Sequence, residues 1–212
     1  MKQITKKTEP NEFIQWKKSF PDIVPGWDEF DTKPIKQVVK KSLLEEQGYI
    51  CCFCETEVDG DHGHIAHLKD QQSHPCDVLN YNNMLYSCPE NERGIPQTCG
   101  HRQKNFNVPI SPLDVDCEER FIYIANGKMF PKNDNDNDAN ETIRILNLNT
   151  KHLSDARAKV IQEIFKQRNC QSANEFQKEF APKLELQNGR FESFWTTKKY
   201  AATVNLQENV FQ

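Results

Sequence analysis

Cysteine and histidine are concentrated in one stretch of this 212-residue chain. Six of the eight cysteines lie between residues 51 and 99, and five of the six histidines lie between residues 62 and 101. The N-terminus has no apolar leader, so secretion and a disulfide framework are not expected. Cysteine and histidine are residue types that bind zinc and activate water. The sequence therefore predicts that residues 48–106 hold the chemistry.

The rest of the composition predicts a thin hydrophobic core. Hydrophobic residues make up 36% of the chain, and even with glycine the share stays below the roughly 45–50% of typical globular proteins. A net charge of −4 is too small for charge repulsion to keep the chain unfolded, so the chain is expected to fold. Because its core is thin, it is expected to gain stability from a metal or a partner. No run approaches the roughly 18 apolar residues of a membrane span, and neither GxxxxGK[ST] nor GxGxxG occurs. The chain is therefore expected to be cytoplasmic and not to bind nucleotides itself through these motifs.

A CxxC pair predicts half of a zinc site. Cys51 and Cys54 have the spacing with which two thiolates bind one ion from a tight turn. Cys88 and Cys99 are the best candidates for the second pair, and a site held by all four would tie the ends of the intervening segment together. Weaker alternatives are Cys76 and Cys117.

Several helices are predicted outside this segment. Apolar residues recur at helical spacing over residues 33–47, with proline in the first turn and Gly48 as a C-terminal cap. A second amphipathic helix is expected over residues 153–165. Ser172 and Glu175 form a capping box that begins a third helix.

A hairpin and a loop are expected between these helices. Residues 121–130 favour a β-hairpin with Asn126 and Gly127 in a type I′ turn. The following residues, 131–141, are predicted to be an exposed loop, and its resemblance to a calcium-binding loop lacks the required glycine and closing glutamate.

The chain divides into three predicted regions. They are an N-terminal helical arm over residues 1–47, a core over residues 48–130 and a C-terminal helical region over residues 131–212. Aromatic residues lie among basic residues at both ends, a mixture that is enriched at interfaces. The ends are therefore predicted to bind a partner, and the alternative is that they cover the thin core. The aromatic residues in question are Trp16, Trp27, Phe194 and Trp195.

A histidine–asparagine–histidine set lies among the cysteines. His67, at the end of a predicted strand from residue 64 to 68, is the best candidate for a general base. Asn83 could orient the strand or loop of that histidine, and His101, where a helical segment begins, could bind a divalent ion at a scissile phosphate. Arg102 and Lys104 would attract the phosphate backbone.

These motifs are familiar as an ordered set. YICCFCE, HIAHLKDQ, NYNNMLYSC and TCGHRQKNF, in this order, resemble the HNH endonucleases with a ββα-metal fold. Within them the chain is similar to the PtuB nuclease subunit of Septu anti-phage systems, which also occurs as a retron effector. The resemblance covers roughly residues 25–168. It implies an α+β fold with a ββα-metal core and a four-cysteine zinc knuckle, flanked by N- and C-terminal α-helices.

The resemblance also assigns roles. It implies that His67 is the general base, that Asn83 or its neighbour Asn82 is the central asparagine, and that the third position is His101, with Asn91 or Asn105 as alternatives. The family usually has an acidic metal ligand directly before the first histidine, and this chain has Ala66 there. An alanine offers no oxygen, so binding of the catalytic ion should be weakened. His64 would share the same face of the strand and could partly substitute.

The implied function is a metal-dependent HNH endonuclease that cleaves phosphodiester bonds in DNA or RNA, transfer RNA included. The expected cofactors are a structural Zn²⁺ and a catalytic Mg²⁺ or Mn²⁺. The implied partners are a PtuA-like ATPase and, in retron versions, a reverse transcriptase with its DNA product. The alternative is a non-catalytic zinc-binding scaffold or recognition subunit of the same kind of complex, which Ala66 favours and the histidine–asparagine–histidine set opposes.

Overall fold

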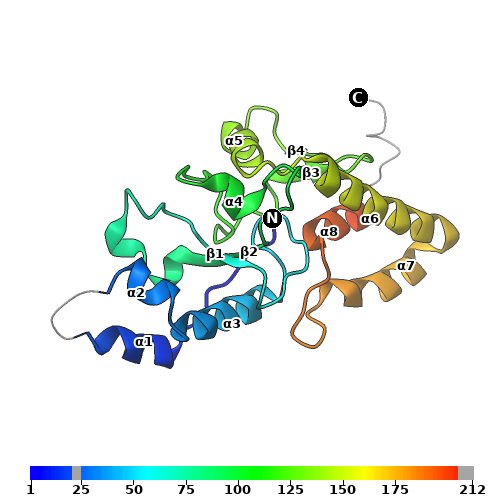
Figure 1. Cartoon of the computed structure of the whole chain (residues 1–212). Helices are drawn as coiled ribbons and strands as arrows, with labels where there is room; N and C mark the ends of the chain where they lie inside the picture. The colour runs from blue at the N-terminus through cyan, green and yellow to red at the C-terminus, as the bar shows by residue number, and fades with distance from the viewer. Residues whose placement is uncertain (21–24, 205–212) are drawn as a thin grey trace.

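Two short hairpins and eight helices make up the computed structural model, which describes residues 1–20 and 25–204 (Figure 1). In the first hairpin, β1 (His64–His67) pairs antiparallel with β2 (Met84–Ser87), and Ala66 lies opposite Leu85. The short helix α4 (Cys99–Gln103) packs against β1. β1, β2 and α4 therefore lie together and carry three of the six histidines, His64, His67 and His101.

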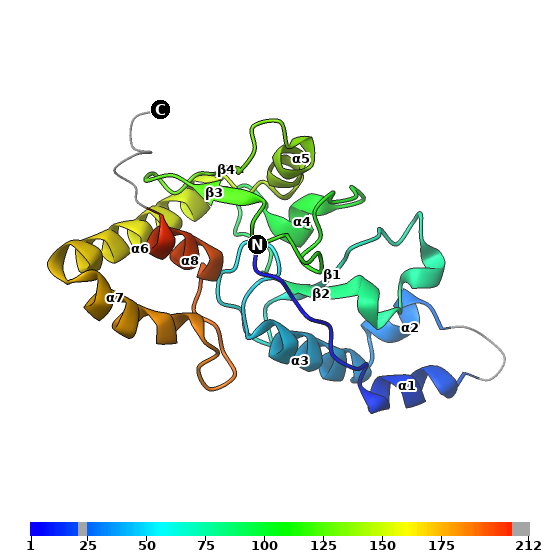
Figure 2. The same ribbon diagram turned by 180° about the vertical axis from the view of Figure 1, so that it is seen from behind.

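Three N-terminal helices pack beside this unit: α1 (Asn11–Lys18), α2 (Trp27–Asp31) and α3 (Ile35–Gln47). The structure confirms the predicted helix α3, which follows Pro34 and ends at Gly48 in the left-handed conformation (φ 62°). α3 packs against both α1 and β2. Figure 2, the view from behind, shows the extended N-terminal segment running past α3 and the β1–β2 hairpin toward α1.

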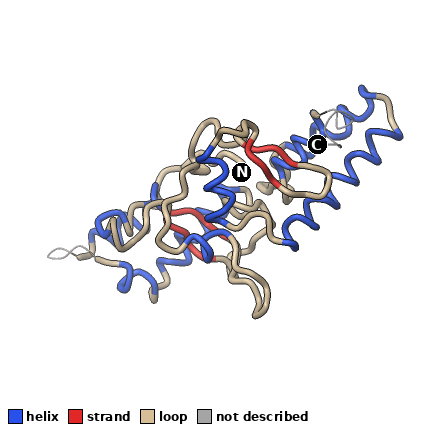
Figure 3. Tube along the Cα trace, turned by 90° about the horizontal axis from the view of Figure 1, so that it is seen from above, coloured by secondary structure: helices blue, strands red, loops and turns tan. Residues whose placement is uncertain are grey.

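Four helices form the C-terminal part: α5 (Asn137–Leu146), α6 (Lys151–Cys170), α7 (Ala173–Phe180) and α8 (Trp195–Thr203). α6 and α8 lie side by side, and α7 begins with the predicted capping box of Ser172 and Glu175. The molecule is elongated, with α7 and α1 toward opposite ends (Figures 1 and 3). Among the helices of the described ranges, none has the length and apolarity needed to cross a bilayer.

The second hairpin corrects the predicted turn. β3 (Phe121–Tyr123) pairs antiparallel with β4 (Met129–Pro131), as expected. However, only Gly127 has a positive φ (77°), whereas a type I′ turn needs positive φ at two residues. The Gly127 N–H donates to the Ile124 carbonyl, and the Ile124 N–H donates to the Lys128 carbonyl. This is the longer hairpin loop, in which a left-handed glycine follows an ordinary turn.

The predicted loop over residues 131–141 is wrong in its second half. Asp136 caps α5 by accepting a hydrogen bond from the Ala139 N–H at 3.0 Å, and helical structure begins at Asn137. The same carboxylate forms a bidentate ion pair with Arg120 at 2.6 and 2.7 Å. A run of Asp and Asn suits a helix cap as well as a loop, so composition alone does not separate the two.

The terminal aromatic side chains pack on the chain itself. Phe194 and Trp195 are buried, and the Trp195 indole donates to the Leu184 carbonyl at 2.7 Å. Trp16 and Trp27 are partly buried against the core. This burial favours the alternative that the ends cover the thin core. Partner binding by the ends stays a prediction, and exposed side chains other than Phe194 and Trp195 would have to make the contact. Three 3₁₀ turns complete the chain: η1 (Pro75–Asp77), η2 (Tyr81–Asn83) and η3 (Ala181–Leu184).

Candidate functional site

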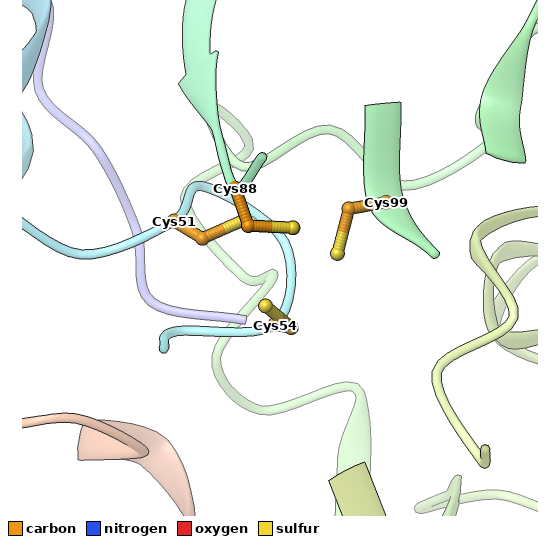
Figure 4. Close-up of side chains that lie close together, drawn as sticks. All are labelled: Cys51, Cys54, Cys88 and Cys99. Atoms are coloured by element: carbon orange, nitrogen blue, oxygen red, sulfur yellow. The ribbon is translucent and has the colours of Figure 1, made fainter. Parts of the chain in front are cut away.

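The four cysteines of the predicted zinc knuckle lie together. Cys51 and Cys54 come from the turn after α3, Cys88 directly follows β2, and Cys99 is the first residue of α4 (Figure 4). Their sulfur atoms all lie within 4.8 Å of one another, and all four residues are buried. Four thiolates at about 2.3 Å from a tetrahedral zinc ion would have a similar mutual separation. The four cysteines are therefore positioned to bind a metal ion, and an all-sulfur tetrahedral set suits zinc.

The surroundings of these sulfurs support a cation at their centre. Burial raises the pKa of Cys99 well above that of an ordinary thiol, because a thiolate there would lose its water. The four thiols would therefore not ionise together without a positive ion between them. The alternative ligands lie elsewhere, since Cys76 is exposed in η1 and the Cys117 thiol donates to the Met1 carbonyl at 3.6 Å.

His67 ends β1 and is buried, with 9% of its surface exposed. Its Nε2 lies 2.9 Å from the Val78 carbonyl, and its Nδ1 lies 2.9 Å from Nε2 of Gln71. A carbonyl can only accept, so Nε2 carries the proton and Nδ1 is the basic atom. The ring packs edge-on against Trp27, with centroids 4.9 Å apart.

Burial also sets the protonation of His67. Desolvation lowers the pKa of His67 below its usual 6.5, and the Val78 carbonyl opposes that effect only in part. The imidazole is therefore neutral at neutral pH, with one nitrogen available to accept a proton. Trp27 comes from the N-terminal region, so a residue outside the cysteine-rich segment helps to bury the candidate base.

Asn83 fastens the loop between β1 and β2. Its Oδ1 accepts from the Lys69 N–H at 2.8 Å, and its Nδ2 donates to the Lys69 and Asp77 carbonyls at 3.2 and 3.0 Å. The loop held in this way contains Gln71 and leads into Val78, the two residues that bond His67. Asn83 therefore positions His67 through the loop. Its neighbour Asn82 is exposed.

His64 and His101 pack together beside Ala66, with ring centroids 3.9 Å apart. The His64 Nδ1 donates to the Cys88 carbonyl at 2.9 Å, which leaves Nε2 as its basic atom. Burial, reinforced by the His101 ring, lowers the pKa of His64 to about 4. Gly100 permits the contact, because a Cβ there would lie 2.4 Å from His64 Nε2 and 3.0 Å from the Ala66 Cβ. His64, Ala66 and Gly100 therefore meet at one place.

An open pocket of about 250 Å³ lies along β1 and α4. It is lined by His64, Ala66 and His67 on one side and by Lys104 and Asn105 on another. Arg102, on the intervening helix, and Lys104 make no ion pair with another residue in the described part of the chain. Asn91 does not line the pocket, and its side chain donates to the Pro96 carbonyl at 2.7 Å. Asn105 lines the pocket, and His101 packs against His64, which also lines it. The residue that fills the third motif position stays a prediction.

Two glutamines of this site lie inside the motifs HIAHLKDQ and TCGHRQKNF but were given no role from the sequence. The buried Gln103 donates from Nε2 to the His67 carbonyl at 2.9 Å and to the Phe106 carbonyl at 3.3 Å. Gln71 holds the basic Nδ1 of His67. Their three-dimensional contacts with His67 give them a role.

The same pocket is a poor match for a catalytic Mg²⁺. That ion prefers carboxylate and water oxygens, and position 66 offers only a methyl group. The nearby carboxylate of Asp70 is buried and accepts the N–H groups of Gln72 and Ser73, both at 2.9 Å. The two imidazoles of His64 and His101 are ligands that suit transition metals. The residues present therefore do not fit a magnesium site.

Comparison with known proteins supports a nuclease relationship. No protein-family model matches the sequence. The chain is similar to a curated protein of Vibrio cholerae serotype O1 biovar El Tor described as "Retron Vc95 putative HNH endonuclease". The two are 29% identical over 141 residues, which are 63% of this chain and 68% of the relative. The chain is thus similar to a retron protein whose description names an HNH endonuclease. Of the predicted set in this chain, His67 lines the pocket, Asn83 holds the loop beside it, and His101 packs against His64.

Proposed function

We propose that this chain is an HNH-type endonuclease subunit that hydrolyses phosphodiester bonds in DNA or RNA. The observation that carries the proposal is the setting of His67, whose tautomer is fixed by the Val78 carbonyl and whose Nδ1 is the basic atom in a pocket edged by Lys104. The loop fastened by Asn83 keeps this arrangement in place. The similarity to the Vibrio cholerae protein supports the same chemistry.

The chain's own residues would share the reaction as follows. His67 accepts a proton at Nδ1 from the attacking water, and Gln71 gives up its hydrogen bond to that atom as water enters. General-base catalysis of this kind contributes about 10²- to 10⁴-fold in rate. Arg102 and Lys104 hold the phosphate backbone by charge. Asn83 holds the loop in place by its hydrogen bonds to Lys69 and Asp77, and the loop in turn holds the ring of His67.

We propose that the cysteine cluster holds a structural Zn²⁺. The knuckle joins the end of β2 to the start of α4, and the Cys88 carbonyl orients His64. The ion would therefore fix α4, which lines the pocket, relative to β2, which pairs with the pocket strand β1. A catalytic Mg²⁺ or Mn²⁺ is proposed only for the form with a carboxylate at position 66, and His101 is the proposed nitrogen ligand beside it.

We also propose that the chain works in an anti-phage defence complex in the cytoplasm. The retron setting of the relative supports this context. A PtuA-like ATPase is the proposed partner, and a retron reverse transcriptase with its DNA product is a further one. A partner would supply the positive charge that long nucleic acids require, because this chain has a net charge of −4.

The test compares the chain with its Ala66→Glu variant, with and without the partner ATPase, on labelled DNA and RNA. With Mg²⁺ or Mn²⁺ present, Ala66→Glu should increase cleavage, and His67→Ala in that background should abolish it while the zinc content is unchanged. Ala66→Gln is the matched control, because it has similar size and lacks the charge. If neither form cuts in the presence of the partner, the nuclease proposal is wrong.

The second candidate function is a non-catalytic zinc scaffold, and Ala66 is the observation that favours it. The scaffold requires that variants of the pocket leave the biological activity of the complex intact. Phage protection by the complex should then survive His67→Ala and fail with Cys54→Ser. A nuclease subunit would lose protection with both substitutions.

A further inference from the structure

Phe106 leaves much of its ring in solvent at the edge of the candidate site. Its exposed fraction is 52%, and Phe130, at 41%, is the other large aromatic side chain exposed to this degree among residues 1–20 and 25–204. Phe130 lies on β4 and does not line the pocket. Phe106 directly follows Lys104 and Asn105, which do line it. An exposed aromatic ring therefore adjoins the pocket that contains His67.

The backbone of Phe106 is fixed relative to the candidate base. The Phe106 N–H donates to the Gln103 carbonyl at 3.0 Å. Gln103 is 2% exposed, and its side chain donates to the carbonyls of both Phe106 and His67, at 3.3 and 2.9 Å. One buried amide thus joins the chain at Phe106 to the end of β1. The backbone from which the ring projects therefore has a fixed place beside the pocket, which suits an anchor for a substrate.

Two basic side chains lie in the segment just before Phe106. Lys104 is exposed two residues before it, Arg102 is half-buried on the preceding helix, and neither has an ionic partner within the described ranges. Asn105 is tied to the opposite rim by a hydrogen bond from its Nδ2 to the Gln72 Oε1 at 2.7 Å. Unpaired basic side chains next to an exposed aromatic ring are the combination by which proteins bind unpaired nucleotides.

We propose that Phe106 stacks on an unpaired nucleobase next to the phosphate in the His67 pocket. The preferred substrate is then single-stranded nucleic acid, or a locally unpaired segment of DNA or RNA, and Lys104 contacts its backbone. In a regular duplex both faces of a base are covered by its neighbours, so Phe106 would find no free face. This inference rests on the proposed nuclease function and adds the substrate class.

The test measures binding without added divalent ions, so that it does not depend on cleavage. Fluorescence anisotropy of a labelled single strand gives the dissociation constant at several salt concentrations, and the same oligonucleotide annealed to its complement is measured beside it. Phe106→Ala should weaken single-strand binding by about 5- to 150-fold, the range that base–aromatic stacking energies predict. Phe106→Trp should retain binding, and duplex binding should be unchanged in both variants.

The controls separate stacking from charge and from apolar contact. Phe130→Ala, which removes the other exposed ring, should bind as the wild type does. The logarithm of the association constant falls linearly with the logarithm of the salt concentration. Lys104→Ala should make this negative slope shallower by about 0.7, whereas Phe106→Ala should leave it unchanged. Phe106→Leu keeps apolar area without a flat ring, so it should behave like Phe106→Ala toward nucleic acid.

The outcomes distinguish this inference from the proposed function. If the chain binds and cuts single strands equally well with Phe106→Ala, the stacking role is wrong while the nuclease proposal stands. If the wild type neither binds nor cuts nucleic acid in the presence of its partner, both are wrong. If Phe106→Ala removes only partner binding, and Phe106→Leu restores it, the ring contacts a protein and the inference is overturned.

Discussion

Asn83→Ala is the sharpest single test of how the site is held together. Asn83 is 5% exposed and makes three hydrogen bonds, to the N–H and carbonyl of Lys69 and to the carbonyl of Asp77. These bonds close the two ends of one loop. The loop contains Gln71 and leads into Val78, which bond the two ring nitrogens of His67. The substitution should therefore affect both the stability of the fold and the position of the base.

The expected size of both effects follows from these contacts. Three hydrogen bonds at about 1 kcal/mol each give a loss of about 3 kcal/mol in the free energy of unfolding. For a chain of this length that corresponds to a fall in Tm of about 6–12 °C. A displacement of His67 by about 1 Å would lower the cleavage rate by about 10²-fold in the active Ala66→Glu background. Circular dichroism measures the first effect, and cleavage well below the lowered Tm measures the second.

Asn82→Ala is the matched control. Its side chain is exposed and forms no hydrogen bond within the described ranges, so both stability and rate should stay near those of the parent. The comparison also decides which asparagine is the central one of the motif. The reasoning is refuted if Asn83→Ala unfolds within 2 °C of the parent, or if Asn82→Ala is the more damaging change.

Three further results are expected. Cys54→Ser should lower the zinc content below one ion per chain and the Tm by about 10 °C or more, and full zinc by elemental analysis would contradict the ligand assignment. In the Ala66→Glu background, cleavage should fall as acid protonates His67, with a midpoint below pH 6.5 because burial lowers the pKa of that ring, and a midpoint above pH 7 would exclude it as the base. Gly127→Ala should cost about 2–4 kcal/mol, because its Cβ would lie 1.9 Å from a carbonyl oxygen of α6. Gly94→Ala, also at positive φ (94°) but with no atom within 4 Å, should cost less, and equal losses in thermal unfolding would exclude the close contact as the cause.

Local patterns in the sequence predicted the elements whose signals are themselves local. α3 carries its apolar stripe and its glycine cap within one segment, and α7 carries its own capping box. α8 was missed because it is covered on several sides, so its apolar residues follow no single stripe. α5 was missed because its N-cap lies within a run of aspartates and asparagines.

The contacts of the candidate site also fall into those that a local sequence pattern predicts and those that it does not. The CxxC spacing predicted that Cys51 and Cys54 would meet, and the structure places the best candidates for the second pair, Cys88 and Cys99, beside them. The contact of His64 with His101 depends on how α4 packs against β1, and Gly100, which permits it, looks ordinary in the sequence. Gln71 and Gln103 both bond His67, one at its ring and one at its carbonyl, and these bonds depend on the folded positions of the side chains. Tertiary packing sets these contacts, and a one-dimensional pattern does not record them.

The join between the cysteine knuckle and α8 limits how this protein can be recombined with its relatives. Glu55, directly after Cys54, has a buried carboxylate that accepts hydrogen bonds from the N–H and hydroxyl of Thr196 at 2.7 and 2.5 Å, and its carbonyl accepts from the Phe194 N–H at 2.8 Å. A chimaera that exchanges the C-terminal helices must therefore bring a compatible partner for Glu55. Otherwise the buried carboxylate beside the metal ligands loses both Thr196 donors and keeps the Met1 ammonium, 3.3 Å from its Oε1, as a partner. Exchanges that keep Glu55 and Thr196 together should be tolerated far better than those that cut between them.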